Sequence, residues 1–581
     1  MSFLLFLLMT AGGTKSSNGR AAPDLSDFRR RYPLTVASFG SLGNREAWLK
    51  AIWETDARWR RLMTPWGGRQ PVEEVVVQGA PPSRLEVEAE FEIIYAGGVL
   101  GLLHAAVMAS RYGRRVMVFD AEEVGRAGRD VNLSQEDLEE FERAGLFSKE
   151  ETERAVVNRY RSGFVKFHDA ASRVKAPPLW MSGVLDVALD ADRLLGLAAS
   201  KIKASATESV MIDGQRLVRV YVEPDRVTVE TEDARTRRHR LFAARLFVDA
   251  TGAESSVGRQ LNSHQAITHV CPTVGTVARG FVRGEEPEKV DFHVGEILVS
   301  NEDAADHRQL IWEGLAGNPS RDEYTTSLFF FDAIDSPADK SLLALFERYF
   351  ETVSRYKQTG AQWRVKRPVF GFLPSSQQHG LSQQRVTASE RVMLIGGGAQ
   401  VVTNPLGSGF GSFVRNLKRL THLTDLALKA DLVDAASLSE INRDEPRVAQ
   451  ISSLAEFLRP TPRSAPATVN ETLNAVMAAL HDLDERVRRE MFQNRMTWAT
   501  LKNLLSRTAK LYPRIFQRMR EHLGARGTFW WLTQVAGVVL QEKRGTRERA
   551  LPEANVSSEE PSEEFARQLR LYKNRQGASS S

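Results

Sequence analysis

The sequence predicts an α/β fold, because strand, glycine-turn and helix signals follow one another in three separate stretches. These stretches are residues 91–120, 245–257 and 391–430. In each of them an apolar run of strand length leads into a glycine turn. In the first and the third a helical pattern follows the turn, and this alternation is typical of α/β domains.

Length and composition indicate a globular protein with more than one domain. The chain has 581 residues, 42% of them hydrophobic, and can bury a large core divided into two or three domains. Its formal charge of +5 is small beside 78 basic and 73 acidic residues, so the charge balance does not indicate nucleic-acid binding. Cys271 is the only cysteine, which excludes an internal disulfide and a cysteine-based metal cluster.

Residues 1–88 are predicted to form an N-terminal extension that becomes helical between about residues 25 and 66. The apolar run at residues 1–13 is too short to span a bilayer, which takes about 20 apolar residues. A secretory signal has basic residues before its apolar run, and none precedes this run. Three interpretations stay open: the remnant of a transit peptide, a weak membrane anchor, or a wrongly assigned start codon.

Residues 91–120 read as a strand, a glycine turn, a helix and a second strand that ends in a carboxylate. The glycines of the turn are Gly97, Gly98 and Gly101. Glycines let the backbone approach a pyrophosphate, and the positive end of the following helix favours that charge. Asp120 follows at about the 20-residue spacing of a dinucleotide-binding fingerprint and would bind a ribose hydroxyl. Ala96 occupies the first glycine position, and a buried unit without nucleotide is the alternative.

A hairpin and a third strand follow farther along the chain. Apolar and polar residues alternate on both sides of Pro224 and Asp225, which predicts a β-hairpin. The strand that begins at Arg245 then ends at Asp249 and Gly252 in a D-x-T-G turn. This order of motifs resembles the one in which hydroxylase-like flavoproteins complete their FAD domain.

The third stretch, residues 391–430, gives a strand, a glycine-rich loop and an amphipathic helix. The apolar residues expected to face the core are Phe413, Leu417, Leu420 and Leu423. The glycines of the loop and of the helix entrance are Gly396, Gly397, Gly407, Gly409 and Gly411. In a flavoprotein such a helix end would lie beneath the isoalloxazine, where its positive partial charge favours the anionic reduced ring. The alternative is an ordinary glycine-rich connection.

These motifs occur in the order of a known family. The matching segments are YAGGVLG at 95–101, RAGRDVNLSQEDL at 126–138, HVCPTVGTVARGF at 269–281, SLFFFDA at 327–333, VFGFLP at 369–374 and PLGSGFGSFVRNLKRL at 405–420. Over about residues 90–540 the chain resembles the FAD-dependent lycopene cyclases of cyanobacteria and green sulfur bacteria. It is closer to their plastid paralogue in the segment FGSFVRNLKRL.

The resemblance implies FAD as cofactor and a Rossmann-like FAD-binding domain of the hydroxylase-like flavoprotein type. That domain would comprise residues 89–265 and 385–430, interleaved with segments of a mixed-sheet substrate domain at 266–384. Residues 431–540 would form C-terminal helices. Charges and serines with few apolar residues predict a mostly disordered tail at 541–581.

The implied reaction is a redox-neutral ring closure at the end of an acyclic carotenoid such as lycopene. It needs an acid that protonates a carbon–carbon double bond, and the resemblance places Asp332 in that role. Phe329 to Phe331 would desolvate this carboxyl and so raise its pKa. Asp335 is the nearby substitute. The alternative interpretation is that Asp332 only forms a turn at the end of a strand.

One departure from the family pattern weakens the predicted cofactor site. Related flavoproteins place an aspartate after the first glycine of the third stretch, whereas this chain has Gly397. Loss of such a hydrogen bond costs about 1.5–3 kcal/mol, or about tenfold to a hundredfold in affinity. Together with Ala96, it motivates the alternative of a non-catalytic paralogue that binds isoprenoids. Among enzymes, the alternative is a flavin-dependent monooxygenase or dehydrogenase acting on another apolar molecule.

The expected partner is a carotenoid or another apolar isoprenoid, without nucleic acid or metal. Three histidines of the substrate region, His264, His269 and His293, have a spacing that fits no metal motif. Helical segments with basic faces near the C-terminus would cover a lipid-facing tunnel or rest on a membrane surface, while core packing is the alternative. The implied location is the plastid; the bacterial cytoplasm or inner-membrane surface is the alternative.

Overall fold

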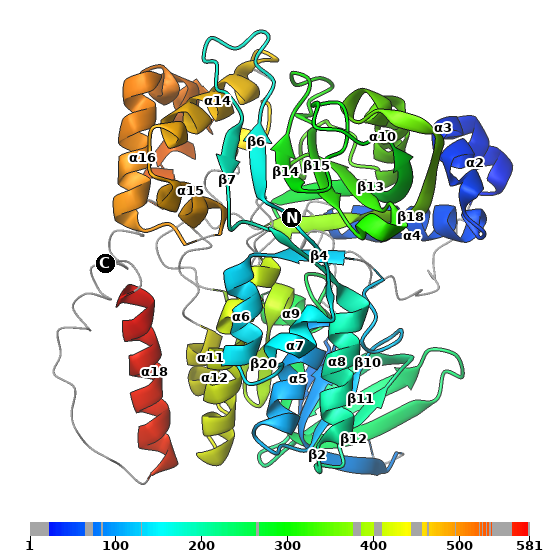
Figure 1. Cartoon of the computed structure of the whole chain (residues 1–581). Helices are drawn as coiled ribbons and strands as arrows, with labels where there is room; N and C mark the ends of the chain where they lie inside the picture. The colour runs from blue at the N-terminus through cyan, green and yellow to red at the C-terminus, as the bar shows by residue number, and fades with distance from the viewer. Residues whose placement is uncertain are drawn as a thin grey trace.

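The chain folds into two large sheets with a small sheet between them, as seen in a computed structural model (Figure 1). The structure describes residues 23–63, 74–82, 85–128, 130–262, 267–375, 385–399, 409–442, 456–461, 464–493, 495–521, 523–525, 527–529, 531–533, 536 and 560–578. Among these residues the sheets have nine, eight and three strands.

The first sheet contains the strands of all three predicted stretches. Its main path is β1 (Val76–Gln78), β10 (Gln215–Val222), β11 (Val227–Asp233), β12 (His239–Asp249), β2 (Val87–Ala96), β3 (Val116–Phe119) and β9 (Val210–Ile212). Strand β20 (Val392–Leu394) lies parallel to β12 and pairs with β19 (Ala388–Ser389). Strand β12 is parallel to β2, and β2 is parallel to β3. The predicted hairpin is confirmed, because β10 and β11 are antiparallel around Pro224 and Asp225.

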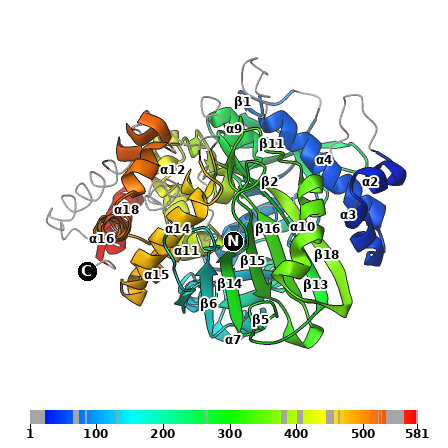
Figure 2. The ribbon, with the colours of Figure 1, turned by 90° about the horizontal axis from the view of Figure 1, so that it is seen from above.

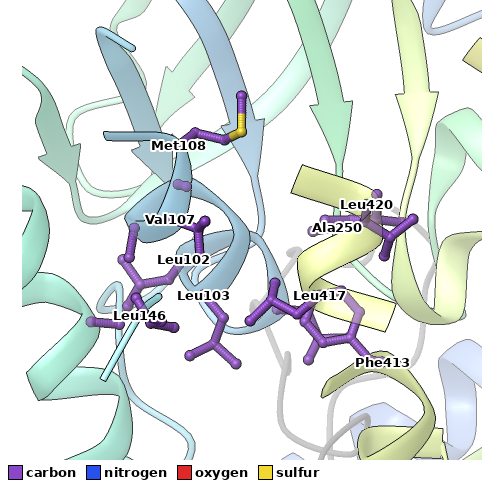
Figure 3. Packing of buried hydrophobic residues seen from close by; sticks show 14 of the residues in the cluster. Leu102, Leu103, Val107, Met108, Leu146, Ala250, Phe413, Leu417 and Leu420 are labelled. Carbon is purple, nitrogen blue, oxygen red and sulfur yellow. The ribbon is translucent and has the colours of Figure 1, made fainter. Parts of the chain in front are cut away.

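Helices fill the space beside the first sheet, and α5 is buried along almost its whole length. They are α5 (Leu100–Ser110), α8 (Ala191–Ala204), α9 (Ser256–Leu261), α11 (Gly409–Lys429) and α12 (Ala435–Asn442). Figure 3 shows Leu103 of α5 and Leu417 of α11 between their two helices, within one buried cluster. The four apolar residues predicted to face the core along α11 are all buried, which confirms that helix and its orientation.

The second sheet is mixed. Its path is β17 (Asp332–Ala333), β13 (His269–Phe281), β16 (Tyr324–Phe329), β15 (Ile311–Ala316), β14 (Val294–Val299), β6 (Ser162–Lys166) and β7 (Leu179–Met181), with β18 (Thr359–Ser375) also paired to β13. Only the pairing of β14 with β6 is parallel.

Different helices pack on the two faces of the second sheet (Figure 2). On one side, which we call the outer face, lie α2 (Leu25–Arg31), α3 (Pro33–Ser38), α4 (Arg45–Met63) and α10 (Leu342–Tyr356). Val274, Leu328 and Trp312 form one row across three strands and pack there with Phe346 of α10. Residues one position along each strand point the other way, to what we call the inner face.

The small sheet lies between the two large sheets, and two capped helices connect its strands β4 (Asp130–Leu133) and β5 (Val156–Arg159). The sheet consists of β4, β8 (Val187–Asp190) and β5. Helices α6 (Gln135–Arg143) and α7 (Lys149–Glu153) begin in capping boxes at Ser134 and Ser148. Such boxes satisfy backbone N–H groups that the first helical turn leaves without partners.

Three C-terminal helices pack beside β6 and β7: α14 (Thr468–His481), α15 (Glu485–Phe492) and α16 (Trp498–Leu511). The prediction of a disordered tail is wrong for residues 561–578, which form α18 (Pro561–Ala578). Phe565, Leu569 and Tyr572 recur at helical spacing and pack against the α11 cluster, so this helix has an apolar stripe to bury. No helix among the described residues is long and apolar enough to span a membrane.

Candidate functional site

The first loop, residues 96–101, connects β2 to α5 in a conformation that only glycine adopts easily. Gly97 has a φ of +106°, and a Cβ atom there would lie 2.5 Å from the carbonyl oxygen of Ala250. The amide of Ala250 donates to the carbonyl oxygen of Ala96 at 2.8 Å. Gly97 is therefore required by the contact between the first loop and the strand end that follows β12.

Asp120 stands at the end of β3, beside the first loop, as the sequence predicts. One carboxylate oxygen accepts from the amide of Gly98 at 2.7 Å, and the other accepts from the amide of Glu122 at 3.0 Å. The side chain is only half-buried. The acid is thus held at the mouth of the glycine turn, within reach of a ligand lying on the loop.

The N-terminus of α5 is uncapped. Its N-cap residue, Val99, makes no side-chain capping bond. The amides of Leu100, Gly101 and Leu102 have no acceptor among the described residues. These N–H groups and the helix dipole create the kind of positive end that binds a phosphate.

The second loop, residues 249–252, is organised by the carboxylate of Asp249. This carboxylate accepts from the amide and the hydroxyl of Thr251 at 2.8 and 2.6 Å, and from the hydroxyl of Ser255 at 2.6 Å. Burial raises the pKa of Asp249, while these hydrogen bonds act in the opposite direction. Because the side chain is fully buried, Asp249 shapes the turn, and only backbone of this loop, such as Gly252, is left to approach a ligand.

The third loop, residues 395–398, meets the other two. The amide of Ile395 donates to the carbonyl oxygen of Asp249 at 2.9 Å. A Cβ atom at Gly396 would lie 2.4 Å from Leu100 of α5, and one at Gly398 would lie 3.5 Å from the carbonyl oxygen of Gly252. The structure therefore brings together the first, second and third loops, which come from distant parts of the sequence.

The third loop also has a neighbour that the sequence did not reveal. Arg385 donates from Nε and Nη2 to the carbonyl oxygen of Gly398 at 3.1 and 2.7 Å. Burial lowers the pKa of Arg385 to about 10. Its only sequence signal is a basic residue seven positions before the strand β20, too weak to place it beside the loop. Gly397 is buried in the third loop and offers no carboxylate there.

The entrance of α11 is described only in part. Gly407 lies outside the described residues, and Gly409 is the first residue of α11. A Cβ atom at Gly411 would lie 2.7 Å from a carboxylate oxygen of Asp137. Arg415 of α11 pairs with the same carboxylate at 2.6 Å. Glycine at position 411 thus makes room for an ion pair that joins α11 to α6.

The residue predicted to be the catalytic acid lies on the outer face of the second sheet. Asp332 pairs in register with Val270, which packs under α10. Its carboxylate is 3.0 Å from the ammonium of Lys340 and also accepts from the hydroxyl of Ser336. A neighbouring ammonium does not favour a proton-donating acid, so this geometry gives the predicted role of Asp332 no support, and the role stays a prediction. The substitute, Asp335, is exposed.

A buried carboxyl that the sequence reasoning missed lies on the inner face. Glu313 of β15 is 2% exposed, and burial raises its pKa to about 7. It pairs in register with Ser327 of β16, which pairs with Gly275 of β13. The available signal was a single acid within IWEGLA, a strand in which every residue is buried.

The structure does not bring together the histidines named in the sequence analysis. His264 lies outside the described residues, and His293 is exposed. The ring of His269 stacks on Phe331, with centroids 5.3 Å apart, and its Nδ1 is 2.9 Å from the hydroxyl of Thr268. Within the described ranges no three histidine, cysteine or acidic side chains are grouped so that they could hold a metal ion.

Comparison with known proteins identifies the fold. No protein-family model and no curated protein matches the chain. A geranylgeranyl bacteriochlorophyll reductase-like protein from Thermoplasma acidophilum is 14% identical, with a TM-score of 0.53 over 74% of this chain and 99% of that chain. Halogenase PltM, solved with phloroglucinol and FAD, is 13% identical with a TM-score of 0.49 over 84% of this chain and 96% of that one. The p-nitrophenol 4-monooxygenase PnpA of Pseudomonas putida is 14% identical with a TM-score of 0.47 over 72% and 99%. The chain therefore shares the mixed α/β fold of the Thermoplasma protein, and the α/β fold class predicted from the sequence is confirmed.

Proposed function

We propose that this protein binds FAD and catalyses a redox-neutral ring closure at the end of an acyclic carotenoid. The observation that supports the cofactor is the convergence of the first, second and third loops around the uncapped end of α5. Loops that meet at a positive helix end are the arrangement in which α/β sheets bind dinucleotides.

Each loop has a defined part in holding the cofactor. The amides at the start of α5 would bind the pyrophosphate, and Asp120 would accept from a ribose hydroxyl. The backbone of the second and third loops would line the chain between phosphate and ring. In its reduced form, FAD supplies a negative charge that stabilises a carbocation. Because Gly397 replaces an aspartate, affinity is expected to be about tenfold to a hundredfold weaker than with a carboxylate.

An apolar substrate is supported by the inner face of the second sheet. Phe329 and Phe331 point to this face within one buried cluster, and Val277 and Val369 pack against each other farther along it. Apolar, desolvated surroundings of this kind suit an isoprenoid, which has no groups for hydrogen bonding. The choice of a carotenoid rests on the sequence segments that resemble the lycopene cyclases.

We propose that the protein acts at a membrane surface of the plastid, where its resemblance to the plastid paralogue would locate it. The segment that follows α16 exposes Phe516 and Phe529, each at 60%. Exposed arginines accompany them, at Arg514 and Arg520. Apolar side chains among cations are the composition with which helices adsorb to anionic lipid, from which a carotenoid would be taken up.

Absorption spectroscopy of the purified protein and pigment analysis of a lycopene-accumulating bacterial host test the proposal together. A flavin spectrum with cyclic carotenoid products supports it. A flavin spectrum with hydroxylated or desaturated products supports the monooxygenase or dehydrogenase alternative. Folded, colourless protein that excess FAD does not reconstitute supports the non-catalytic isoprenoid-binding paralogue.

A further inference from the structure

We infer that Glu313 is the proton donor of this protein, presented to an apolar substrate from the inner face of the second sheet. The inference rests on the proposed function and assigns the acid that the ring closure requires. It replaces Asp332, which strand register places on the opposite face.

Register fixes the face of Glu313. Trp312 and Gly314, its neighbours along β15, belong to the outer face: Trp312 packs with α10, and a Cβ atom at Gly314 would lie 2.7 Å from the hydroxyl of Tyr356 of α10. Side chains alternate along a strand, so Glu313 points to the inner face. Ser327 and Gly275 stand directly beside it in the same row. Directly paired residues have Cβ atoms about 5 Å apart, so Glu313 and Ser327 act on the same ligand position.

The inner face is directed toward the FAD-type half of the molecule. Arg367 of β18 belongs to this face, because it pairs with Val277, two positions from Gly275. Its charge interacts with Asp130 of β4 and Asp192 of α8, which belong to the small sheet and to the first half. The Arg367 end of the inner face is therefore directed toward the small sheet and α8, where a substrate would meet the cofactor. Farther along this face, Phe329 and Phe331 pack with residues of α14 and α16, while α10 covers the outer face.

The surroundings of Glu313 suit an acid that stays protonated. Ser327 is 1% exposed, and its hydroxyl has no hydrogen-bond partner among the described residues. This hydroxyl is available to a ligand or to the carboxyl beside it. Desolvation raises the pKa of Glu313 to about 7, which leaves a large protonated fraction at neutral pH.

Several titratable groups of the described residues lie around Glu313. The phenols that interact with it are Tyr160, Tyr324 and Tyr356, all with raised pKa values and therefore uncharged at neutral pH. On the outer face of β14, Glu296 pairs with Lys357. Helix α14, which packs on the inner side, carries Glu471, whose carboxylate accepts from the hydroxyl of Tyr512. On the inner face itself, Arg367 and His269 stand toward opposite ends of β13 and β18.

The chemical step is balanced without an oxidant or a reductant. The O–H bond of Glu313 breaks, and the electron pair of the terminal double bond forms a C–H bond at one of its carbons. The other carbon becomes a cation, and the electron pair of a second double bond closes the ring onto it. The resulting cation loses a proton from a neighbouring carbon to the Glu313 carboxylate. A double bond re-forms, the acid is restored, and the product is an isomer of the substrate.

The test compares the wild-type holoprotein with E313Q and with E323Q as matched control. Glu323 lies in the same domain, in a partly exposed ion pair with Arg279, and its amide variant should leave activity unchanged. Flavin content and the rate of cyclic product formation from lycopene are measured for each protein. E313Q should retain flavin and lose activity by about a hundredfold or more, because an amide has no acidic proton. The wild-type rate should fall as pH rises through about 7, and E313Q should lack this dependence.

Each other outcome is decisive. Unchanged product formation by flavin-loaded E313Q overturns the role of Glu313 and leaves the proposed function standing. Loss of flavin and fold in E313Q, with E323Q intact, shows a structural residue and also overturns the inference. Flavin-loaded wild-type protein that forms no cyclic product overturns the proposed reaction, and the inference with it.

Discussion

The first and second sheets carry their candidate chemistry in different ways. Around the first sheet it lies mainly in the backbone, in glycines at tight turns and uncapped amides, with the side-chain carboxylate of Asp120 beside one loop. On the second sheet it lies in side chains, and strand register decides which of them face the interior. Asp332 and Glu313 are both buried acids of that sheet, yet Asp332 forms an ion pair with Lys340 on the outer face, whereas Glu313 lies on the inner face. Sites built from backbone groups can thus be predicted from local sequence. Sites built from side chains depend on the register in which strands pair, which local sequence does not reveal.

The largest effect is expected at the backbone site. Gly97→Val forces a branched side chain into positive φ and against the Ala250 carbonyl oxygen, which lies 2.5 Å from the Cβ position. Strain and overpacking together should cost about 4 kcal/mol or more. Urea denaturation measures the loss. The control is Gly196→Ala in α8, where a Cβ atom meets nothing within 4 Å and stability should rise slightly. Equal stability of both variants would refute the close loop contact.

The next effect tests the outer face. Lys340→Met leaves the carboxylate of Asp332 buried without its cation, which should cost about 3–5 kcal/mol. Adding Asp332→Asn removes the uncompensated charge and should restore part of this loss. Denaturant unfolding of the two single variants and the double variant gives the coupling energy. If the three effects are simply additive, the ion pair does not explain the burial of Asp332.

The inner face predicts an unusual dependence of stability on pH. The pKa of Glu313 is raised by folding from 4.5 to about 7, so the folded state binds this proton more tightly than the unfolded state does. Its contribution to stability is therefore fully present at low pH and is lost as pH rises from about 4.5 to about 7. The loss is about 3 kcal/mol. The free energy of unfolding should fall with rising pH over this range in the wild type, and this fall should be absent in E313Q. Parallel pH profiles of the two proteins would contradict the raised pKa of Glu313.

The smallest effect is expected for FAD affinity when Asp120, beside the first loop, is substituted. Asp120→Asn keeps the shape of the side chain but removes the charge that binds a ribose hydroxyl, so FAD affinity should fall about tenfold to a hundredfold. Flavin fluorescence quenching during titration of apoprotein measures it. Asp225→Asn at the exposed hairpin turn serves as control and should bind FAD like the wild type. A loss of affinity in both variants would point to general destabilisation.

The sequence predicts the first half of the molecule well because its signals are local. Gly97, Gly101 and Asp120 lie within one strand–turn–helix–strand unit, and the residues next to Pro224 are enough to predict the hairpin. The meeting of the loops is less local, since Ile395 bonds Asp249 across the sheet. It could be predicted only because the motifs occur in a familiar order.

The second half was predicted less well, for a physical reason. The face of Asp332 follows from its pairing with Val270, and that of Glu313 from its pairing with Ser327, neither of which the local pattern reveals. The contact of Arg385 with the carbonyl oxygen of Gly398 joins residues 13 positions apart, and no local motif indicates it. Helix α18 was missed because a short apolar stripe among many charges needs the surface of α11 to become ordered.

The central claim is that three loops from distant parts of the chain form one FAD site. Its most direct test is the absorption spectrum of purified protein after incubation with excess FAD and removal of the free cofactor. The convergence of the loops predicts a retained flavin spectrum that bleaches on reduction. Folded protein that stays colourless after this treatment would contradict the claim.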